Sequence, residues 1–289
     1  MRKLIRQLTF SLCVLTSCSS LCNAEQQEII HWARYEMPPF YIHTQSLRNQ
    51  GIADQLFSLL QRNLPQYEHR TYTASVPRIF RSFAEDKILC TGFTKMKGRE
   101  QLMHYSEPAL LLSSHHLIYL KKNRDTLMTQ FPLLAGQHVS LNALIEQMRS
   151  GQLAVKPSRS YGAPLNPHLK EHAAKLSEFQ VSDSLPEVVK KMQKRRFDFI
   201  LEYPIAITYQ LQQAGITEEL ESIALNENSE LLYAYVTCSR NPRSAKAIGA
   251  INRVISQYRA TPHYRSLVER WLPADKIEQY RKNYQHFLK

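Results

Sequence analysis

The sequence lacks any apolar run long enough to cross a membrane, and it lacks a metal-binding cysteine pattern. A transmembrane helix needs about 20 mostly apolar residues, whereas the apolar stretch near the start, Leu8–Leu15, is too short and too rich in serine. Five cysteines occur in 289 residues, with no Cys-x-x-Cys or cysteine–histidine spacing. The sequence therefore predicts no metal site and implies no cofactor.

Internal repeats, low-complexity tracts and nucleic-acid-binding motifs are also absent. Lysine and arginine number 37 against 25 aspartate and glutamate residues, but most of the basic residues are scattered. One dense basic run stands at the polar end of a helical pattern, where positive charge is favourable against the helix dipole. That run consists of Lys190, Lys191, Lys194, Arg195 and Arg196. We interpret it as a solvated helix end and expect no nucleic-acid partner.

The N-terminus has the parts of an export signal, so residues 1–24 are predicted to be a signal peptide. Arg2, Lys3 and Arg6 precede the apolar run, and Ala24 ends a small-residue cleavage site. Because residues 1–24 hold three basic and no acidic residues, the net charge of +12 becomes +9 without them. Cleavage after Ala24 would release the protein. Alternatively, the segment ending at Cys18 resembles a bacterial lipobox, which would anchor the protein through a lipid on that cysteine.

Cleavage after Ala24 would leave two cysteines, Cys90 and Cys238. An even number of cysteines in an oxidising compartment predicts one disulfide, and two buried free thiols are the alternative.

Strand-like and helix-like runs alternate along the chain, which predicts an α/β fold. The length of 289 residues suits two compact lobes better than one core. Strands are predicted at 28–33, 69–73, 87–91, 110–120, 152–156, 179–182, 197–202 and 231–237. Helices are predicted at 52–63, 76–84, 141–149, 168–176, 185–192, 205–213, 244–258 and 264–289. Within the strand at 110–120, one of His115 and His116 is expected to point inward and the other outward.

Four segments occur in an order that resembles the periplasmic solute-binding proteins of family 3, which serve polar amino acid transporters. The segments are Tyr35–Phe40 with Gly51–Asp54, Gly92–Arg99 with Tyr105–Pro108, Leu153–Gly162, and Arg196–Pro204. The second is the most specific, because its glycine, threonine and arginine precede a Ser-x-Pro. The resemblance spans nearly the whole chain after residue 24, but only these short segments carry it.

The resemblance implies that Arg99 pairs with a ligand carboxylate, with Thr94 and the Gly92 loop beside it. A guanidinium offers a planar fork that matches two carboxylate oxygens. Taken alone, Arg99 also fits an exposed arginine at the start of a helix. In the third segment, the loop of Ser160, Tyr161 and Gly162 is expected to donate hydrogen bonds to an anion, and a plain turn is the alternative.

The sequence departs from the family pattern at two positions of the expected site. The family's carboxylate for the ligand amino group falls here on Tyr203, and Glu202 stands one residue early, on the opposite face of a strand. Either a local bulge turns Glu202 inward, or the site does not hold an α-amino group in the usual way. Met37 replaces a frequent aromatic residue, with Tyr35 and Phe40 nearby to stack on a ligand or pack the core.

The resemblance implies a type 2 periplasmic-binding-protein-like fold with two lobes and two hinge crossings. Residues 25–113 and 229–289 would form a discontinuous first lobe, and residues 114–228 the second. The crossings are expected near Leu112–His115 and Leu225–Ser229. Both Cys90 and Cys238 would then lie at strand ends of the first lobe, which favours their pairing.

The function that the resemblance implies is capture of a small polar or carboxylate-bearing, amino-acid-like ligand by hinge closure. We expect a monomer in the periplasm that serves an ABC-type transporter in the inner membrane. One alternative is a periplasmic sensor that acts on a membrane signalling partner. Another is a dehydratase-like enzyme, which would need Glu202 or a histidine as acid or base. Solute capture, the function that we expect, needs no catalytic residue.

Overall fold

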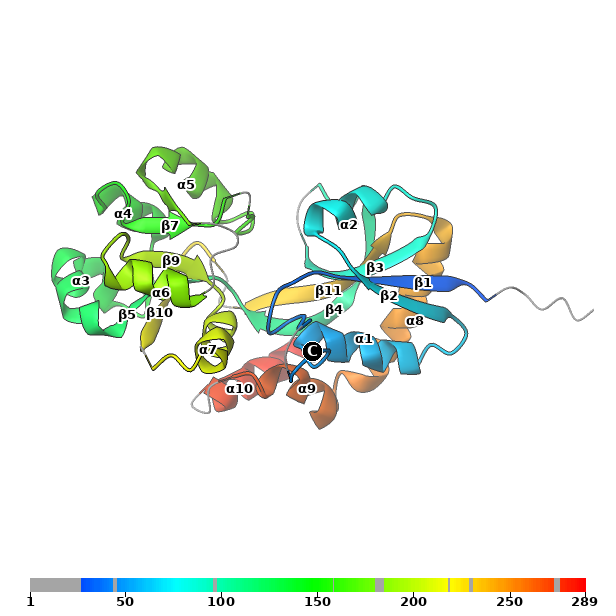
Figure 1. Cartoon of the computed structure of the whole chain (residues 1–289). Coiled ribbons are helices and arrows are strands. Elements are labelled where there is room, and N and C mark those ends of the chain that lie inside the picture. Colours follow the sequence, from blue (N-terminus) through cyan, green and yellow to red (C-terminus); the bar gives the residue numbers. More distant parts are fainter. Residues whose placement is uncertain are drawn as a thin grey trace, which may run out of the picture.

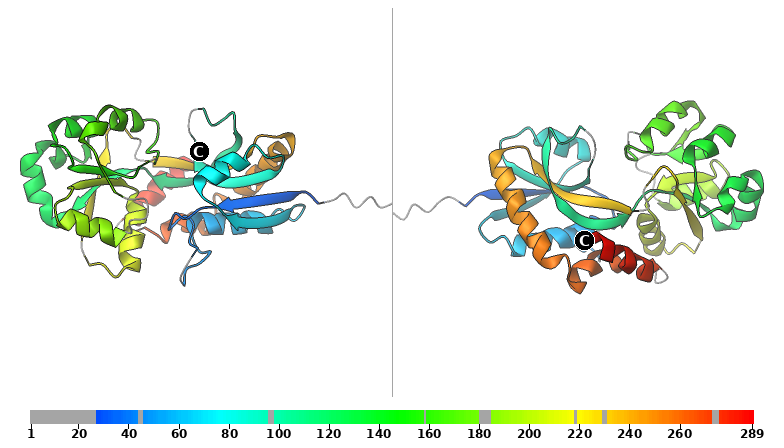
Figure 2. Two further views of the ribbon diagram at one scale, coloured as in Figure 1. Left: turned by 45° about the horizontal axis from the view of Figure 1, so that its top comes forward. Right: turned by 180° about the vertical axis from the view of Figure 1, so that it is seen from behind.

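The described chain is built around two separate β-sheets. The computed structural model describes residues 27–43, 46–95, 98–157, 159–179, 185–217, 219–228, 231–272 and 276–289. Figure 1 shows the two sheets side by side, each with helices packed around it, and Figure 2 shows the same two-lobed arrangement from other sides. The predicted signal peptide, including Cys18, lies outside the described residues.

The first sheet has the strand order β2-β1-β3-β11-β4. Its strands are β1 (Ile29–Arg34), β2 (Glu68–Thr73), β3 (Ile88–Thr94), β4 (Met103–Ser113) and β11 (Leu231–Ser239). β1 runs parallel to β2 and β3, whereas β11 runs antiparallel to β3 and β4. Because β11 joins this sheet from far along the chain, the first lobe is discontinuous in sequence.

The helices of the first lobe bury apolar faces against this sheet. They are α1 (Ile52–Arg62), α2 (Val76–Ser82), α8 (Pro242–Tyr258), α9 (Pro262–Glu269) and α10 (Ile277–Phe287). The start of α1 is fixed by Asp54, whose carboxylate accepts hydrogen bonds from the backbone N–H groups of Gly51 and Ile42 at 3.1 and 2.9 Å. The carboxylate of Asp54, at the third helical position, thus bonds the backbone N–H of the residue that precedes the helix, as the acidic residue of a capping box does.

The second sheet has the strand order β6-β10-β5-β9-β7-β8. Its strands are β5 (His116–Leu120), β6 (His138–Val139), β7 (Leu153–Val155), β8 (Ser177–Glu178), β9 (Phe199–Glu202) and β10 (Leu220–Leu225). The helices around it are α3 (Arg124–Gln130), α4 (Leu141–Gln147), α5 (Asn166–Glu171), α6 (Leu185–Gln193) and α7 (Pro204–Gln213). Short 3-10 turns stand at Lys121–Asn123, Pro132–Ala135 and Ala173–Lys175.

Two predicted elements are each divided in the structure. The apolar run expected as one strand at 110–120 is split by Ser114 and His115 into the end of β4 and the whole of β5, which belong to different sheets. The helix expected at 264–289 is likewise two helices, α9 and α10. The first division is where the chain passes from one sheet to the other. The return passage joins β10 to β11, and residues 229 and 230 of it lie outside the description.

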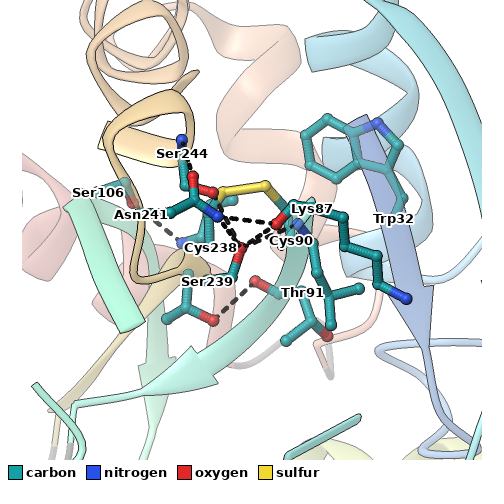
Figure 3. Close-up of a disulfide and its surroundings, with 12 residues drawn as sticks. Trp32, Lys87, Cys90, Thr91, Ser106, Cys238, Ser239, Asn241 and Ser244 are labelled. Carbon is teal, nitrogen blue, oxygen red and sulfur yellow. Dashed lines mark hydrogen bonds between the residues drawn. A yellow bond between two sulfur atoms is a disulfide. The ribbon is translucent and has the colours of Figure 1, made fainter. Parts of the chain in front are cut away.

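The predicted disulfide is confirmed: Cys90 of β3 is bonded to Cys238 of β11, 148 residues further along the chain. The two cysteines are directly opposite in the antiparallel ladder and fully buried. Figure 3 shows the bond inside the first lobe, with Trp32 on one side and the polar cluster around Ser239 on the other. In that cluster Ser239 donates a hydrogen bond to the Lys87 carbonyl oxygen at 2.5 Å. The disulfide therefore joins two strands, β3 and β11, and all strands of the second sheet lie between them along the chain.

One helix of the second lobe contributes to the core of the first. Tyr203, Ile205 and Ala206, at the start of α7, belong to the same buried apolar cluster as α1 and α8. Further along α7, the ring of Tyr209 meets that of Trp271 at 5.4 Å. The lobes thus share an apolar contact beside the crossing segments.

None of the helices in the described ranges is long and apolar enough to cross a membrane.

Candidate functional site

A cavity of about 750 Å³ lies between the lobes. The first lobe supplies the segment after β1 and the start of α2, and the second supplies the segment after β7, the end of β9, and α6 and α7 (Figure 1). Lining residues include Tyr35, Met37, Val76, Lys156, Arg159, Leu185, Glu202 and Tyr209. In α/β sheets, ligands bind beyond the carboxyl ends of parallel strands, which is where Tyr35, Lys156 and Glu202 stand. The volume is in the range of small-molecule sites.

The second-lobe wall of the cavity is organised by an ion pair between Arg159 and Glu202. Two guanidinium nitrogens of Arg159 donate to the two carboxylate oxygens of Glu202 at 2.6 and 2.7 Å. The backbone N–H of Tyr203 donates to the same carboxylate at 2.9 Å, and Lys156 Nζ lies 3.7 Å from it. Burial alone would raise the pKa of Glu202, but these cationic neighbours and hydrogen bonds lower it to about 2. Glu202 is therefore ionised at neutral pH.

Glu202 faces the cavity without a β-bulge. It is the last residue of β9 and pairs in regular register with His116. Tyr203 has already left the strand, because it is the residue that precedes the first turn of α7. Its ring points to the first lobe, where it meets Phe40 at 6.0 Å. The end of the strand, rather than an extra residue within it, brings Glu202 to the site.

His115 lies behind the ion pair at the crossing between β4 and β5. It is 5% exposed, and its Nε2 lies 3.3 Å from a guanidinium nitrogen of Arg159. Its ring packs on that of Tyr203 at 3.9 Å. Burial, together with the nearby positive charge of Arg159, lowers the pKa of His115 to about 3. The imidazole is thus neutral at neutral pH, and its Nε2 can accept a hydrogen bond from Arg159. His116 is less buried than His115, in line with the expected alternation.

Tyr35 is the first-lobe residue in the centre of the site. It lines both the interlobe cavity and a smaller apolar one of about 110 Å³ that is lined mainly by the first lobe. Its hydroxyl donates to the Gly92 carbonyl oxygen at 3.1 Å. Burial raises the pKa of Tyr35 well above its ordinary value, while the positive charges of Arg99 and Arg159 act in the opposite direction. Tyr35 therefore lies within the electrostatic reach of one arginine from each lobe.

The smaller cavity brings together five of the ten residues that the sequence suggested for the site. They are Tyr35, Met37, Gly92, Thr94 and Tyr203. Gly92 has no room for a side chain, because a Cβ there would lie 2.9 Å from the Tyr41 hydroxyl, which accepts the Gly92 N–H at 3.0 Å. Tyr35 and Met37 line the interlobe cavity as well, and Glu202 lines the interlobe cavity alone.

Arg99 is held on an aromatic stack beside these cavities and lines neither of them. Its guanidinium lies 4.5 Å from the ring centre of Phe80 and 5.6 Å from that of Phe93, and Phe93 in turn stacks on Tyr35. Within the described part of the chain no carboxylate pairs with Arg99. Partial burial lowers its pKa from the ordinary arginine value. A half-buried cation without an acidic partner is suited to bind an anion.

The loop of Ser160, Tyr161 and Gly162 is closed on itself. The Tyr161 N–H donates to the Asn166 side-chain oxygen at 2.8 Å, and the Gly162 N–H to the Ser160 hydroxyl at 3.3 Å. The Tyr161 hydroxyl accepts the Lys156 N–H at 2.8 Å. None of these three residues lines either cavity. Tyr161 of this loop contacts Lys156 and Arg159, and these two residues line the interlobe cavity.

Sequence reasoning did not select Lys156, His115 or Arg159 for the site. Arg159 and Glu202 are 43 residues apart, and no local pattern indicates that their elements meet. The one available signal was an arginine beside a loop that was expected to bind an anion, together with a glutamate displaced from its expected position.

Comparison with known proteins gives the fold. No protein-family model matches the sequence, and no curated protein matches it. Among solved structures, the chain resembles one from work on glutathione import through GshT and the cystine ABC importer TcyBC of Streptococcus mutans. That match has a TM-score of 0.63 at 14% identity and covers 87% of this chain and 99% of the other.

Two further structures have the same architecture. The probable amino-acid ABC transporter extracellular-binding protein ytmK of Bacillus subtilis matches with a TM-score of 0.64 at 16% identity, covering 86% of this chain and 99% of that one. A histidine kinase sensor domain with similarity to periplasmic binding proteins matches with a TM-score of 0.61 at 13% identity, covering 85% and 96%. The predicted two-lobed periplasmic-binding-protein-like fold is confirmed.

Proposed function

We propose that this protein is an exported periplasmic solute-binding protein that closes its two lobes around a small carboxylate-bearing ligand. The observation that carries the proposal is the cavity of about 750 Å³ whose walls come from both sheets. Because two chain passages connect the sheets, the lobes can rotate about them and enclose a ligand. Residues 25–113 and 229–289 act as one body and residues 114–228 as the other.

Arg99 holds a carboxylate of the ligand from the first lobe. Its guanidinium is fixed by Phe80 and Phe93, so little side-chain freedom is lost when it binds. Thr94 and the Gly92 loop contribute hydrogen bonds beside it, and Tyr35, Met37 and Tyr203 contact the apolar part of the ligand. From the second lobe, the segment from Arg159 to Gly162 closes over the ligand and brings the Arg159–Glu202 pair against it.

The biological role that fits this action is delivery of the ligand to an ABC-type transporter. Structures with the same fold include a probable amino-acid ABC transporter extracellular-binding protein. The protein acts as a monomer after cleavage of residues 1–24. Mass spectrometry of the mature protein separates release after Ala24 from lipid anchoring at Cys18, because the two products differ by several residues and a lipid.

A thermal-shift screen of amino acids, short peptides and organic acids tests the proposal. A ligand that binds only the folded state raises the melting temperature. At a ligand concentration of 100 times Kd, the folded state is stabilised by about 2.7 kcal/mol. Arg99→Ala should remove the shift for carboxylate ligands while the protein stays folded. Arg243→Ala is the matched control. Arg243 pairs with Asp86, which precedes the first residue of β3, and it lines neither cavity. An unchanged shift in Arg99→Ala would remove Arg99 from the site, and no shift with any compound would argue against ligand capture.

Signalling is the second candidate, supported by the similarity to a histidine kinase sensor domain. Crosslinking of the ligand-loaded protein in cells discriminates the two roles. Capture of a permease subunit supports transport, and capture of a membrane kinase supports signalling.

A further inference from the structure

The cavity of about 110 Å³, called the apolar pocket below, borders the interlobe cavity, because Tyr35 and Met37 line both. We infer that the apolar pocket takes up the side chain of the ligand. Given the proposed ligand-binding function, the site then selects carboxylates with an apolar side chain of about four carbon atoms over polar ones of the same size.

The two cavities differ in the chemistry of their walls. The described residues that line the apolar pocket are all uncharged, and apart from Gly92 and Thr94 they are aromatic residues, leucines, alanines and a methionine. Charged residues line part of the interlobe cavity, among them Arg159 and Glu202. A charged group left without a partner in an apolar cavity is costly. A ligand that occupies both cavities is therefore amphipathic, with its charged head between the lobes and its apolar end in the apolar pocket.

Two tyrosine hydroxyls in the apolar pocket are already bonded to the backbone of Gly92. The hydroxyl of Tyr35 donates to the Gly92 carbonyl oxygen at 3.1 Å, and the hydroxyl of Tyr41 accepts the Gly92 N–H at 3.0 Å. The two rings also pack on each other, with centres 5.0 Å apart. A polar side chain that entered here would lose its water without gaining these groups as partners, whereas an apolar side chain would lose no hydrogen bond.

The boundary between the cavities has one fixed and one adaptable side chain. Tyr35 is held by its hydrogen bond to Gly92 and by its stacking on Phe93 at 5.6 Å. Met37 is half-buried against the first-lobe core, and its unbranched thioether chain adapts to irregular spaces. Met37 is therefore the side chain that makes way when a ligand enters the apolar pocket.

The volume of the apolar pocket sets the size of the side chain. An apolar cavity of about 150 Å³ takes up benzene, so about 110 Å³ suits roughly four carbon atoms, the number in a leucine side chain. Each buried methylene group strengthens binding about fourfold. Leucine should therefore bind roughly 50-fold more tightly than alanine, and the ring of phenylalanine should exceed the available space.

Isothermal titration calorimetry with alanine, valine, leucine, phenylalanine and asparagine tests the inference. Affinity should rise from alanine through valine to leucine and fall at phenylalanine. Asparagine has nearly the shape of leucine but should bind no better than alanine, because its amide would be buried without partners. The 2-oxo acids that correspond to the four apolar amino acids repeat the series without an ammonium group.

Two substitutions in β11 change the apolar pocket in opposite directions. Ala234→Leu fills it, so the preference for leucine over alanine should disappear. Leu232→Ala enlarges it, so the optimum should move from leucine to phenylalanine. Leu231→Ala is the matched control and should leave the series unchanged. Leu231 packs against the same core as its neighbour Leu232, is likewise half-buried and lines neither cavity.

Each variant is read as a ratio of two affinities, so a general loss of stability or of lobe closure does not imitate the effect. If Ala234→Leu does not fold, Leu232→Ala decides, because it removes atoms from the wall instead of adding them. Tighter binding of asparagine than of leucine overturns the inference while ligand capture stands. So does a preference that these substitutions leave unchanged, or a ligand found only outside both series. Failure of every compound in these series and in the wider thermal-shift screen instead overturns the proposed function.

Discussion

Loss of the Cys90–Cys238 bond should destabilise the first lobe by several kcal/mol. In the chain-entropy treatment, a loop of 148 residues corresponds to about 5 kcal/mol of unfolding free energy at 25 °C. If the second lobe stays folded while the first unfolds, only roughly 35 residues of the loop are flexible, and the figure falls to about 4 kcal/mol. Small and medium domains are stable by about 5–15 kcal/mol, so this loss is a large fraction of the total.

Denaturant unfolding followed by tryptophan fluorescence measures this loss. The chain has two tryptophans, Trp32 and Trp271, and both belong to the first lobe. We compare the oxidised protein, the reduced protein and Cys90→Ala/Cys238→Ala. Reduction should lower the unfolding midpoint strongly, because it removes the bond and keeps both sulfurs buried. The double variant should fall somewhat further through lost packing and should not respond to reductant.

The entropy reasoning would be refuted by one clear pattern. If the oxidised and reduced proteins unfold at the same denaturant concentration, the bond does not restrict the unfolded chain as calculated. A drop only in the double variant would assign the whole effect to packing around two buried side chains.

Three other perturbations have directions that the structure fixes. Glu202 and His115 have folded-state pKa values of about 2 and 3, below their ordinary values. Their stabilisation is therefore complete above about pH 6.5 and lost as the pH falls toward 2, which melting temperatures between pH 7.5 and 3 would show. Gly51→Ala would put a Cβ 2.4 Å from the Phe40 carbonyl oxygen; we expect a loss of about 1–3 kcal/mol in denaturant unfolding. Glu227→Ala removes the acceptor of two backbone N–H groups at the start of α4, and calorimetric melting should show a loss of about 1 kcal/mol.

The order of elements and the fold were predictable because hydrophobic periodicity is local. The helix at 52–63, for example, is predicted by the spacing of apolar residues on one face, and these residues are buried in α1. The division at Ser114 and His115 was expected from the family resemblance, which places a crossing near Leu112–His115, and not from periodicity. Apolar residues continue on both sides of it, so composition alone does not reveal that β4 and β5 enter different sheets.

The candidate site was predictable only as a set of segments. Motif spacing selected Tyr35, Met37 and Glu202, which the structure brings to one cavity. The partner of Glu202 depends on the packing of β7 beside β9, a tertiary contact that the sequence does not encode locally. Strand alternation suggested that Glu202 faces away, but that rule no longer applies where the strand ends and α7 begins.

The apolar contact between the start of α7 and the first lobe affects more than packing. Tyr203, Ile205 and Ala206 join the two lobes through their own buried contacts, so these contacts supply part of the ordering that lobe closure requires. Affinity depends on the fraction of molecules already poised to bind. Under the proposed function, substitutions at Ile205, which lines neither cavity, would therefore change the affinity for the ligand without touching the binding residues.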